Sequence, residues 1–157
     1  MKELLIGAVL ILIVSNIISY VRKPDLASNN LPTLNVTLLD GSNYTQKKAK
    51  PLVLHFWATW CPTCKLEASN IEHISSDYEV LSIAVNSGSD AEIKRYMKDN
   101  ELTFRVVNDF DGRWAKRFKV EAFPTTFIYD AKGVLLFTEV GYTTTAGLLA
   151  RLKMIEL

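Results

Sequence analysis

Residues 56–67 read FWATWCPTCKLE and contain the only two cysteines of the chain, Cys61 and Cys64. Two cysteines separated by two residues close a small disulfide ring only on a particular backbone, which the start of a helix supplies. The free N–H groups and the dipole of a helix start also favour the thiolate of the first cysteine, the nucleophile of disulfide exchange. Pro62 suits the first helical turn, where the N–H that proline lacks is not needed. The spacing therefore predicts a redox-active pair at a helix start.

Two other uses of a C-x-x-C pair fit this sequence less well. A zinc site needs about four ligands. The chain has no further cysteine, and its only histidines are His55 and His73. A structural disulfide would stabilise little, because so short a ring closes almost no loop. We therefore predict no metal site and no cofactor other than the redox-active Cys61–Cys64 disulfide.

Composition bounds the remaining possibilities. The chain has 157 residues, 48% of them hydrophobic, which is enough to bury one core, so we expect one folded domain. We also expect the protein to be a monomer. Its formal net charge of +1 gives no sign of a nucleic-acid partner.

The amino-terminal segment differs in kind from the rest of the chain. Leu4–Val21 has no charged residue, and its eighteen residues would rise about 27 Å as a helix, close to the roughly 30 Å of a bilayer core. A cleaved signal peptide usually has a shorter apolar region, of about 7–15 residues, and no convincing cleavage site follows Tyr20. We therefore predict an uncleaved anchor at residues 1–23, a linker at residues 24–32 and the folded domain at residues 33–157.

Two considerations on membrane orientation conflict. Arg22 and Lys23 follow the apolar segment, so the positive-inside rule favours a cytoplasmic domain. A catalytic dithiol, in contrast, makes most sense where disulfides form and must be managed. We expect a single-pass protein of the inner membrane with its catalytic domain on the periplasmic side.

Hydrophobic periodicity and turn residues predict the order of the elements. The order is β-α-β-α-β followed by β-β-α, which indicates an α/β fold with a mixed sheet and helices on both faces. The expected strands, after a short hairpin at 35–45, are 52–57, 80–85, 104–107, 125–129 and 134–140. The expected helices are one from residue 61, 89–100, 112–118 and 148–155.

Two of these helices carry further signals. The helix from residue 61 has Leu66, Ile71 and Ile74 at helical spacing, which predicts that these three side chains share its buried face. The next helix opens with Ser89 three residues before Glu92, the pattern of a capping box.

This order, with W-C-x-x-C at the end of the first long strand, resembles the thioredoxin fold. A second stretch, FPTTFI at residues 123–128, is similar to the segment of that superfamily that holds a cis proline across from the dithiol. The resemblance implies that Pro124 is cis, and that the backbone at Phe123 is extended beside the disulfide, where a substrate strand can pair. The alternative is a trans Pro124 that starts an edge strand.

Within the superfamily, residues 56–64 and Glu67 resemble the membrane-anchored TlpA/ResA/DsbE branch. The anchor, the linker and residues 86–90 look closest to the suppressor-of-copper-sensitivity D proteins. The resemblance implies a thiol-disulfide oxidoreductase that acts on protein disulfides and dithiols. It further implies a reductase that a membrane electron donor of the DsbD type keeps reduced.

Two departures from the branch bear on its partners. Ala122–Thr125 stands where DsbE proteins have Gly-Ala-Pro-Glu, and Ser69 stands where the branch usually has a proline. These changes weaken the expectation of a dedicated role in cytochrome c biogenesis and leave the dithiol chemistry intact. Two alternatives remain open: an oxidising dithiol enzyme, and a module that binds Cu(I) through two soft thiolates.

The expected catalytic residues are Cys61 as the attacking thiol, Cys64 as the resolving thiol, and Glu67. Glu67 lies one helical turn past Cys64 and could act as a base to that thiol, the alternative being an ordinary acid favoured by the helix dipole. His55 stands where thioredoxins have a buried aspartate. It could exchange a proton with the second thiol or be a satisfied core histidine.

The expected substrate contacts surround the dithiol. Trp60 and Phe123 are predicted to form an exposed apolar rim, whereas Trp57, Phe127 and Trp114 are predicted to lie in the core. The complete set of predicted substrate-binding residues is Trp60, Pro62, Thr63, Phe123 and Pro124.

Overall fold

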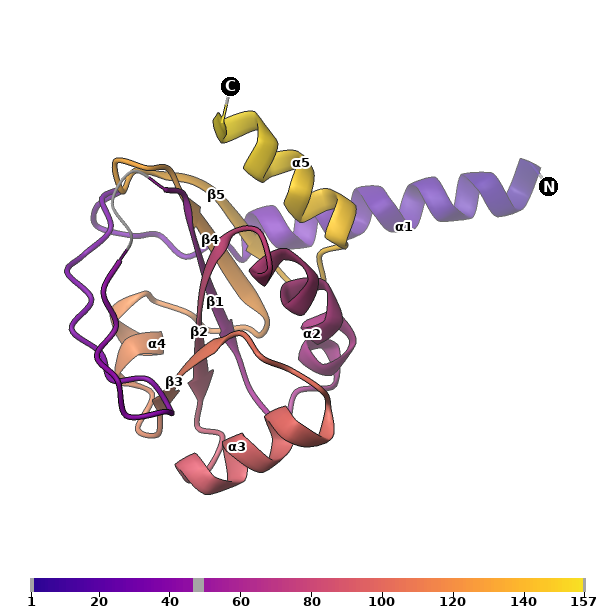
Figure 1. Cartoon of the computed structure of the whole chain (residues 1–157). Helices are drawn as coiled ribbons and strands as arrows, with labels where there is room; N and C mark the ends of the chain where they lie inside the picture. Colours follow the sequence, from indigo (N-terminus) through magenta and orange to yellow (C-terminus); the bar gives the residue numbers. More distant parts are fainter. Residues whose placement is uncertain (1, 47–49, 157) are drawn as a thin grey trace.

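The computed structural model describes residues 2–46 and 50–156 (Figure 1). Its helices are α1 (Lys2–Val21), α2 (Pro62–Ser75), α3 (Asp90–Asp99), α4 (Arg113–Arg117) and α5 (Thr145–Glu156). Its strands are β1 (Leu52–Trp57), β2 (Glu79–Val85), β3 (Arg105–Asp109), β4 (Thr125–Tyr129) and β5 (Leu135–Val140). The five strands form one sheet in the order β3-β2-β1-β4-β5.

The sheet is mixed, as the sequence predicts. β1, β2 and β3 are parallel, while β4 runs antiparallel to both β1 and β5. Every residue of β1 and β2 is buried, which agrees with their continuous apolar runs. Side chains from α2, α3 and α5 fill the core on one face, and α4 with the segment around Val36 and Tyr44 fills the core on the other. The predicted thioredoxin-like α/β fold is therefore confirmed.

Several predicted elements differ from the structure in detail. Residues 35–45 form a turn with a single isolated bridge, Thr37 to Asn43, in place of a regular hairpin. β3 starts one residue later than predicted because Phe104 leaves the strand and packs edge-on against Trp57, with ring centroids 6.0 Å apart. The predicted capping box of α3 is present, with Ser89 and Glu92 bonded reciprocally.

The prediction for Leu66 is wrong, because this side chain is 71% exposed. The buried face of α2 is set by Ile71 and Ile74, and steps of three or four residues back from Ile71 reach Glu67 and Cys64 rather than Leu66.

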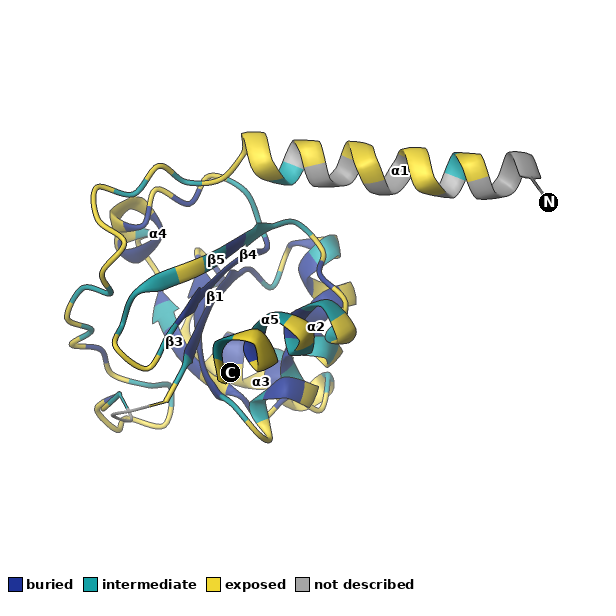
Figure 2. Cartoon of the chain, turned by 90° about the horizontal axis from the view of Figure 1, so that it is seen from above, coloured by how far each residue is buried: buried dark blue, intermediate teal, exposed yellow. Residues whose placement is uncertain are grey.

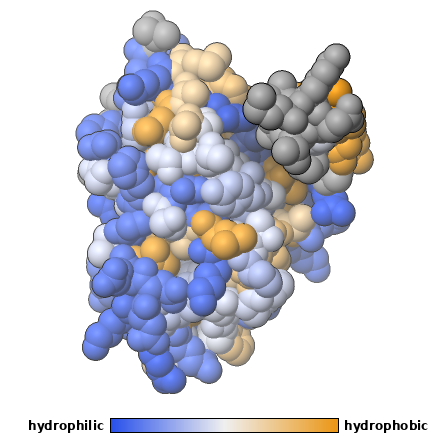
Figure 3. Space-filling view, turned by 90° about the vertical axis from the view of Figure 1, so that its right-hand side faces the viewer, coloured by the Kyte–Doolittle hydropathy of each residue, from blue (hydrophilic) through white to orange (hydrophobic). Residues whose placement is uncertain are grey.

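On the side of the molecule that carries α2 and α5, hydrophobic surface is broken into small patches among hydrophilic residues (Figure 3).

The segment predicted as a linker contacts the folded domain. Leu31 N donates to Gly133 O at 2.7 Å, and Leu135 N donates to Asn29 O at 2.7 Å. Residues 29–31 thus lie along the turn between β4 and β5 and cover part of a sheet edge.

The helix α1 projects from the domain, and its end contacts β5 through a hydrogen bond from Val140 N to Ser19 Oγ at 3.2 Å (Figures 1 and 2). None of the helices formed by the described residues combines the length and the apolar character needed to cross a bilayer.

Candidate active site

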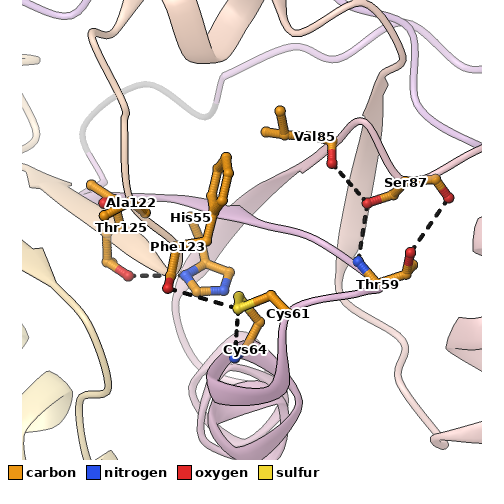
Figure 4. Close-up of a disulfide and its surroundings, with 10 residues drawn as sticks. His55, Thr59, Cys61, Cys64, Val85, Ser87, Ala122, Phe123 and Thr125 are labelled. Atoms are coloured by element: carbon orange, nitrogen blue, oxygen red, sulfur yellow. Dashed lines mark hydrogen bonds between the residues drawn. A yellow bond between two sulfur atoms is a disulfide. The ribbon is translucent and has the colours of Figure 1, made fainter.

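The two cysteines lie where β1 passes into α2 and are joined by a disulfide (Figure 4). Their Cα atoms are 5.3 Å apart. Cys61 has extended backbone angles and is the N-cap of α2, and Pro62 occupies the first turn. The Cys61 sulfur accepts a hydrogen bond from Cys64 N at 3.1 Å. This sulfur therefore occupies the place of a capping oxygen, at the positive end of the helix.

The loop that contains Pro124 lies across from the first sulfur. The Phe123–Pro124 peptide bond is cis, as the resemblance implied. The carbonyl oxygen of Phe123 lies 3.7 Å from Cys61 Sγ, and Thr125 Oγ1 closes the turn by donating to Ala122 O at 2.8 Å (Figure 4). Gly141 N donates to Pro124 O at 2.8 Å, which ties the start of the β5–α5 loop to this segment.

Ser87 holds the loop that precedes Cys61, a role that the sequence analysis did not identify. Ser87 Oγ accepts a hydrogen bond from Thr59 N at 3.0 Å and donates to Val85 O at 3.0 Å (Figure 4). Its side chain is buried, so both contacts are protected from water. Only a short polar residue just after a buried strand signals this role, and that pattern is too common to be diagnostic.

The aromatic residues divide as predicted except for Phe123, which is half-buried and packs against both halves of the core. Trp60 is 60% exposed and packs edge-on against Phe123, with ring centroids 5.8 Å apart. Trp57, Phe127 and Trp114 are buried in the two halves of the core. Of the other predicted substrate contacts, Pro62 is exposed, Thr63 is half-buried and Pro124 is buried. An apolar rim therefore stands beside the disulfide, open to a partner.

Glu67 is fully buried on the same face of α2 as Cys64. Its Oε1 accepts a hydrogen bond from Thr143 N at 2.9 Å, and its Oε2 has no hydrogen-bond partner among the described residues. Burial raises the pKa of this carboxyl from 4.5 to about 8; the Thr143 N–H lowers it in part, and the charge of Glu139 raises it. A carboxyl with this pKa can hold or release a proton near neutral pH, as a base or acid must.

His55 points to the same face of the sheet as Trp57, toward α2. Its Nδ1 lies 2.9 Å from Thr126 Oγ1, and burial lowers the pKa of the imidazole to about 3. A histidine with so low a pKa stays neutral, so the structure favours a satisfied core histidine over a proton carrier. The other histidine, His73, is exposed on α2.

Within residues 2–46 and 50–156, no three His, Cys, Asp or Glu side chains come together as a potential metal site. The two sulfurs are joined to each other and nearly buried, with Cys61 6% and Cys64 2% exposed.

Several known proteins are similar to this chain in sequence or in fold. The Redoxin family matches residues 26–152 of the chain. Thioredoxin-like protein YneN of Bacillus subtilis is 30% identical over 159 aligned positions, covering 92% of this chain and 93% of that protein. Thiol-disulfide oxidoreductase ResA of Bacillus thuringiensis is 30% identical over 131 positions, covering 79% of this chain and 75% of that protein. The crystal structure of StoA from Bacillus subtilis superposes with a TM-score of 0.66 and 25% identity, covering 76% of this chain and 96% of that one.

The raised pKa of Glu67 predicts a pH-dependent stability. The folded state favours the protonated carboxyl, so the unfolded chain releases this proton first as the pH rises. The free energy of unfolding therefore falls between pH 4.5 and about 8, by up to about 1.4 kcal/mol per pH unit. Glu67→Gln, which cannot titrate, should lose this slope.

Urea unfolding of both proteins from about pH 6.5 to pH 8 measures the difference. The contribution of His55 cancels, because that residue is present in both proteins. Parallel stability curves for wild type and Glu67→Gln would show that Glu67 has an ordinary pKa.

Proposed function

The chain belongs to the Redoxin family and is a thioredoxin-like thiol-disulfide oxidoreductase, and from this premise we propose that Cys61 is its attacking thiol and Cys64 its resolving thiol. The observation that carries this assignment is the hydrogen bond from Cys64 N to the Cys61 sulfur. In the reduced protein this N–H and the helix dipole favour the thiolate of Cys61 over that of Cys64. Cys61 is also the more exposed of the two cysteine residues.

The exchange proceeds in two balanced steps. The Cys61 thiolate attacks one sulfur of the partner's disulfide, which forms a mixed disulfide and releases a partner thiolate. The Cys64 thiolate then attacks Cys61 Sγ, which closes the Cys61–Cys64 disulfide and releases the second partner thiolate. The partner's disulfide gains two electrons, the enzyme's dithiol loses them, and two thiol protons pass to the partner. The structure corresponds to the oxidised enzyme at the end of this sequence.

Glu67 takes the proton of Cys64 in this scheme and releases it to the departing partner thiolate. Its Oε2, which has no hydrogen-bond partner in the described part of the chain, and its raised pKa support the role, because the carboxyl can accept a proton near neutral pH without losing its bond to Thr143. Trp60, Pro62, Thr63, Phe123 and Pro124 receive the partner's chain beside the dithiol. The exposed side chains of Trp60 and Pro62, next to the half-buried Thr63 and Phe123, support a peptide segment as the bound form.

The direction of the reaction is reductive in this proposal. A membrane electron donor of the DsbD type would return electrons to the Cys61–Cys64 disulfide, and partner proteins would consume them. The resemblance of residues 56–64 and Glu67 to the reducing members of the TlpA/ResA/DsbE branch supports this direction. The alternative is an oxidising enzyme, because Pro62 directly after the first cysteine also occurs in strongly oxidising dithiols.

We place the enzyme at the inner membrane, with residues 1–23 as a single-pass anchor and the domain in the periplasm. The uncharged run Leu4–Val21, taken over the full sequence, supports an anchor, although the described residues of α1 alone do not meet the length and apolar character of a bilayer span. The helix α1 projects from the folded domain (Figure 2). Its described apolar residues are exposed, which also supports an anchor; they are Ile6, Val9, Leu10, Ile13, Val14 and Ile17. Tethering confines the dithiol near membrane-bound donors and raises its effective concentration there.

A Cu(I)-binding module is the second candidate, supported by the resemblance to the copper-sensitivity D proteins and the softness of two thiolates. It predicts that reduced protein binds Cu(I) tightly but fails to reduce a disulfide substrate. The oxidoreductase assignment predicts that the reduced protein reduces a disulfide substrate and does not bind Cu(I) tightly.

The thiol assignment predicts which cysteine traps a partner. Cys64→Ser lacks the resolving thiol, so it should accumulate a mixed disulfide through Cys61, detected by non-reducing electrophoresis and mass mapping of the cross-linked peptide. Cys61→Ser is the matched control and should trap at least tenfold less. Cross-links that form only through Cys64 would reverse the two roles.

The reductive direction predicts the redox equilibrium with glutathione. We expect a reduction potential nearer the about −270 mV of thioredoxin than the about −120 mV of DsbA. The fraction of oxidised protein, measured by thiol alkylation in graded glutathione buffers, gives the value. A potential at the oxidising end of this range would establish the oxidase instead.

The topology predicts the behaviour of carboxyl-terminal reporter fusions. A reporter that is active only after export should be active when fused after Leu157, and a reporter that works only in the cytoplasm should be silent. Arg22 and Lys23 favour the reverse result through the positive-inside rule, so the pair of fusions separates the two orientations.

A further inference from the structure

Phe110 is an exposed aromatic residue that neither the sequence analysis nor the proposed mechanism uses. It directly follows β3 and is 67% exposed. Since β3, β2 and β1 are parallel and adjacent, their carboxyl ends meet at one edge of the sheet, and the dithiol follows β1 at that edge. A single exposed apolar side chain is ordinary, but the loop that carries Phe110 is bonded directly to the residues of the site.

Asn86 makes that connection. Asn86 O accepts a hydrogen bond from Trp60 Nε1 at 3.0 Å, and Asn86 Nδ2 donates to Phe110 O at 2.9 Å. Asn86 N also donates to Asp109 O at 3.0 Å. Asn86, which directly follows β2, therefore binds both the Trp60 indole in the β1–α2 loop and the Phe110 backbone in the β3–α4 loop.

The backbone around Asn86 suits this close approach. Asn86 has a φ of 44°, in the left-handed region that asparagine tolerates better than most residues. A Cβ at Gly112 would lie 3.3 Å from Asn86 Oδ1, so the β3–α4 loop packs tightly against the Asn86 side chain. Asn86 therefore ties the backbone of Phe110 to the residue that also binds the Trp60 indole, while the Phe110 side chain stays exposed.

We propose that Phe110 joins Trp60 and Phe123 in an aromatic arc that binds an apolar side chain near the reacting cysteine of a protein partner, with Asn86 as its positioning residue. This inference rests on the proposed function, because the partner reaches the arc only when its disulfide meets Cys61. The three aromatic residues come from three separate loops, and Trp60 already contacts Phe123 edge-on.

The occupant is a protein segment rather than a small disulfide. Trp60 and Phe110 are both more than half exposed, so their rings gain contact only when another surface covers them. A small disulfide such as glutathione carries no apolar side chain to place there. An extended segment with a leucine or phenylalanine beside its cysteine does.

The test compares three disulfides with the full-length enzyme: oxidised glutathione, a peptide disulfide with leucines flanking each cysteine, and the same peptide with serines. For Phe110→Ser we expect KM for the leucine peptide to rise about tenfold, the usual loss for a well-buried aromatic contact, with kcat unchanged. The constants for glutathione and the serine peptide should stay within twofold. Phe110→Tyr, which keeps the ring, should behave like wild type.

Met154→Ser is the matched control, because Met154 is 64% exposed, similar to Phe110, and lies on α5. It should leave all three substrates unchanged. Equal losses on all three substrates in Phe110→Ser would indicate a structural defect, and no loss on the leucine peptide would remove Phe110 from the contact surface; either result overturns the proposal. Wild type that fails to exchange with any of the three disulfides would overturn the proposed function, and the inference with it.

Asn86→Asp tests the positioning role. Aspartate also tolerates the left-handed backbone and keeps the carbonyl that binds Trp60, but it lacks the donor to Phe110 O. We expect the same selective rise in KM for the leucine peptide as in Phe110→Ser. The double variant should add no further loss, because both changes remove one contact. Additive losses would show that Asn86 acts independently of Phe110 and would overturn its positioning role.

Discussion

Burial of β1 on both faces is the constraint on which this structure depends. The strand lies in the middle of the sheet, paired with β2 on one side and β4 on the other. Its apolar residues enter both halves of the core, so the strand can neither slide nor tilt without exposing them. Cys61 therefore emerges from a rigid support, at the point where the chain must turn into α2.

Hydrogen bonds, more than packing, complete the site at this edge. The loop before Cys61 is bonded to Ser87, the first sulfur faces the Phe123 carbonyl, and Pro124 O accepts from Gly141 N. Polar bonds of this kind fix the backbone while leaving side chains such as Trp60 free to face solvent. The arrangement resolves a conflict between two needs: a precise dithiol and an apolar surface left uncovered for a partner.

Glu67 illustrates the cost of function inside a core. A buried carboxyl with only one bonded oxygen destabilises the ionised form, so the folded chain gives up stability as the pH rises. A leucine of similar size would avoid this cost but could not move a proton. Thr143, which binds Glu67, lies two residues from Gly141, so the β5–α5 loop joins the proton-holding group to the Pro124 segment.

The amino-acid sequence by itself determined the strand β1, the order of the elements, the capping box at Ser89 and the place of the dithiol, because each depends on neighbouring residues and on spacing along one element. The burial of Trp57, Phe127 and Trp114 followed from the same patterns. Leu66 shows the limit: its spacing from Ile71 looked helical, but the tertiary contacts of α2 selected Glu67 and Cys64 for the buried face. The contacts of Asn86 and Ser87, the docking of residues 29–31 and the neutral state of His55 were decided only by the tertiary structure. Each of them joins residues far apart in the chain, and the burial that sets a pKa or protects a hydrogen bond exists only after the sheet has formed.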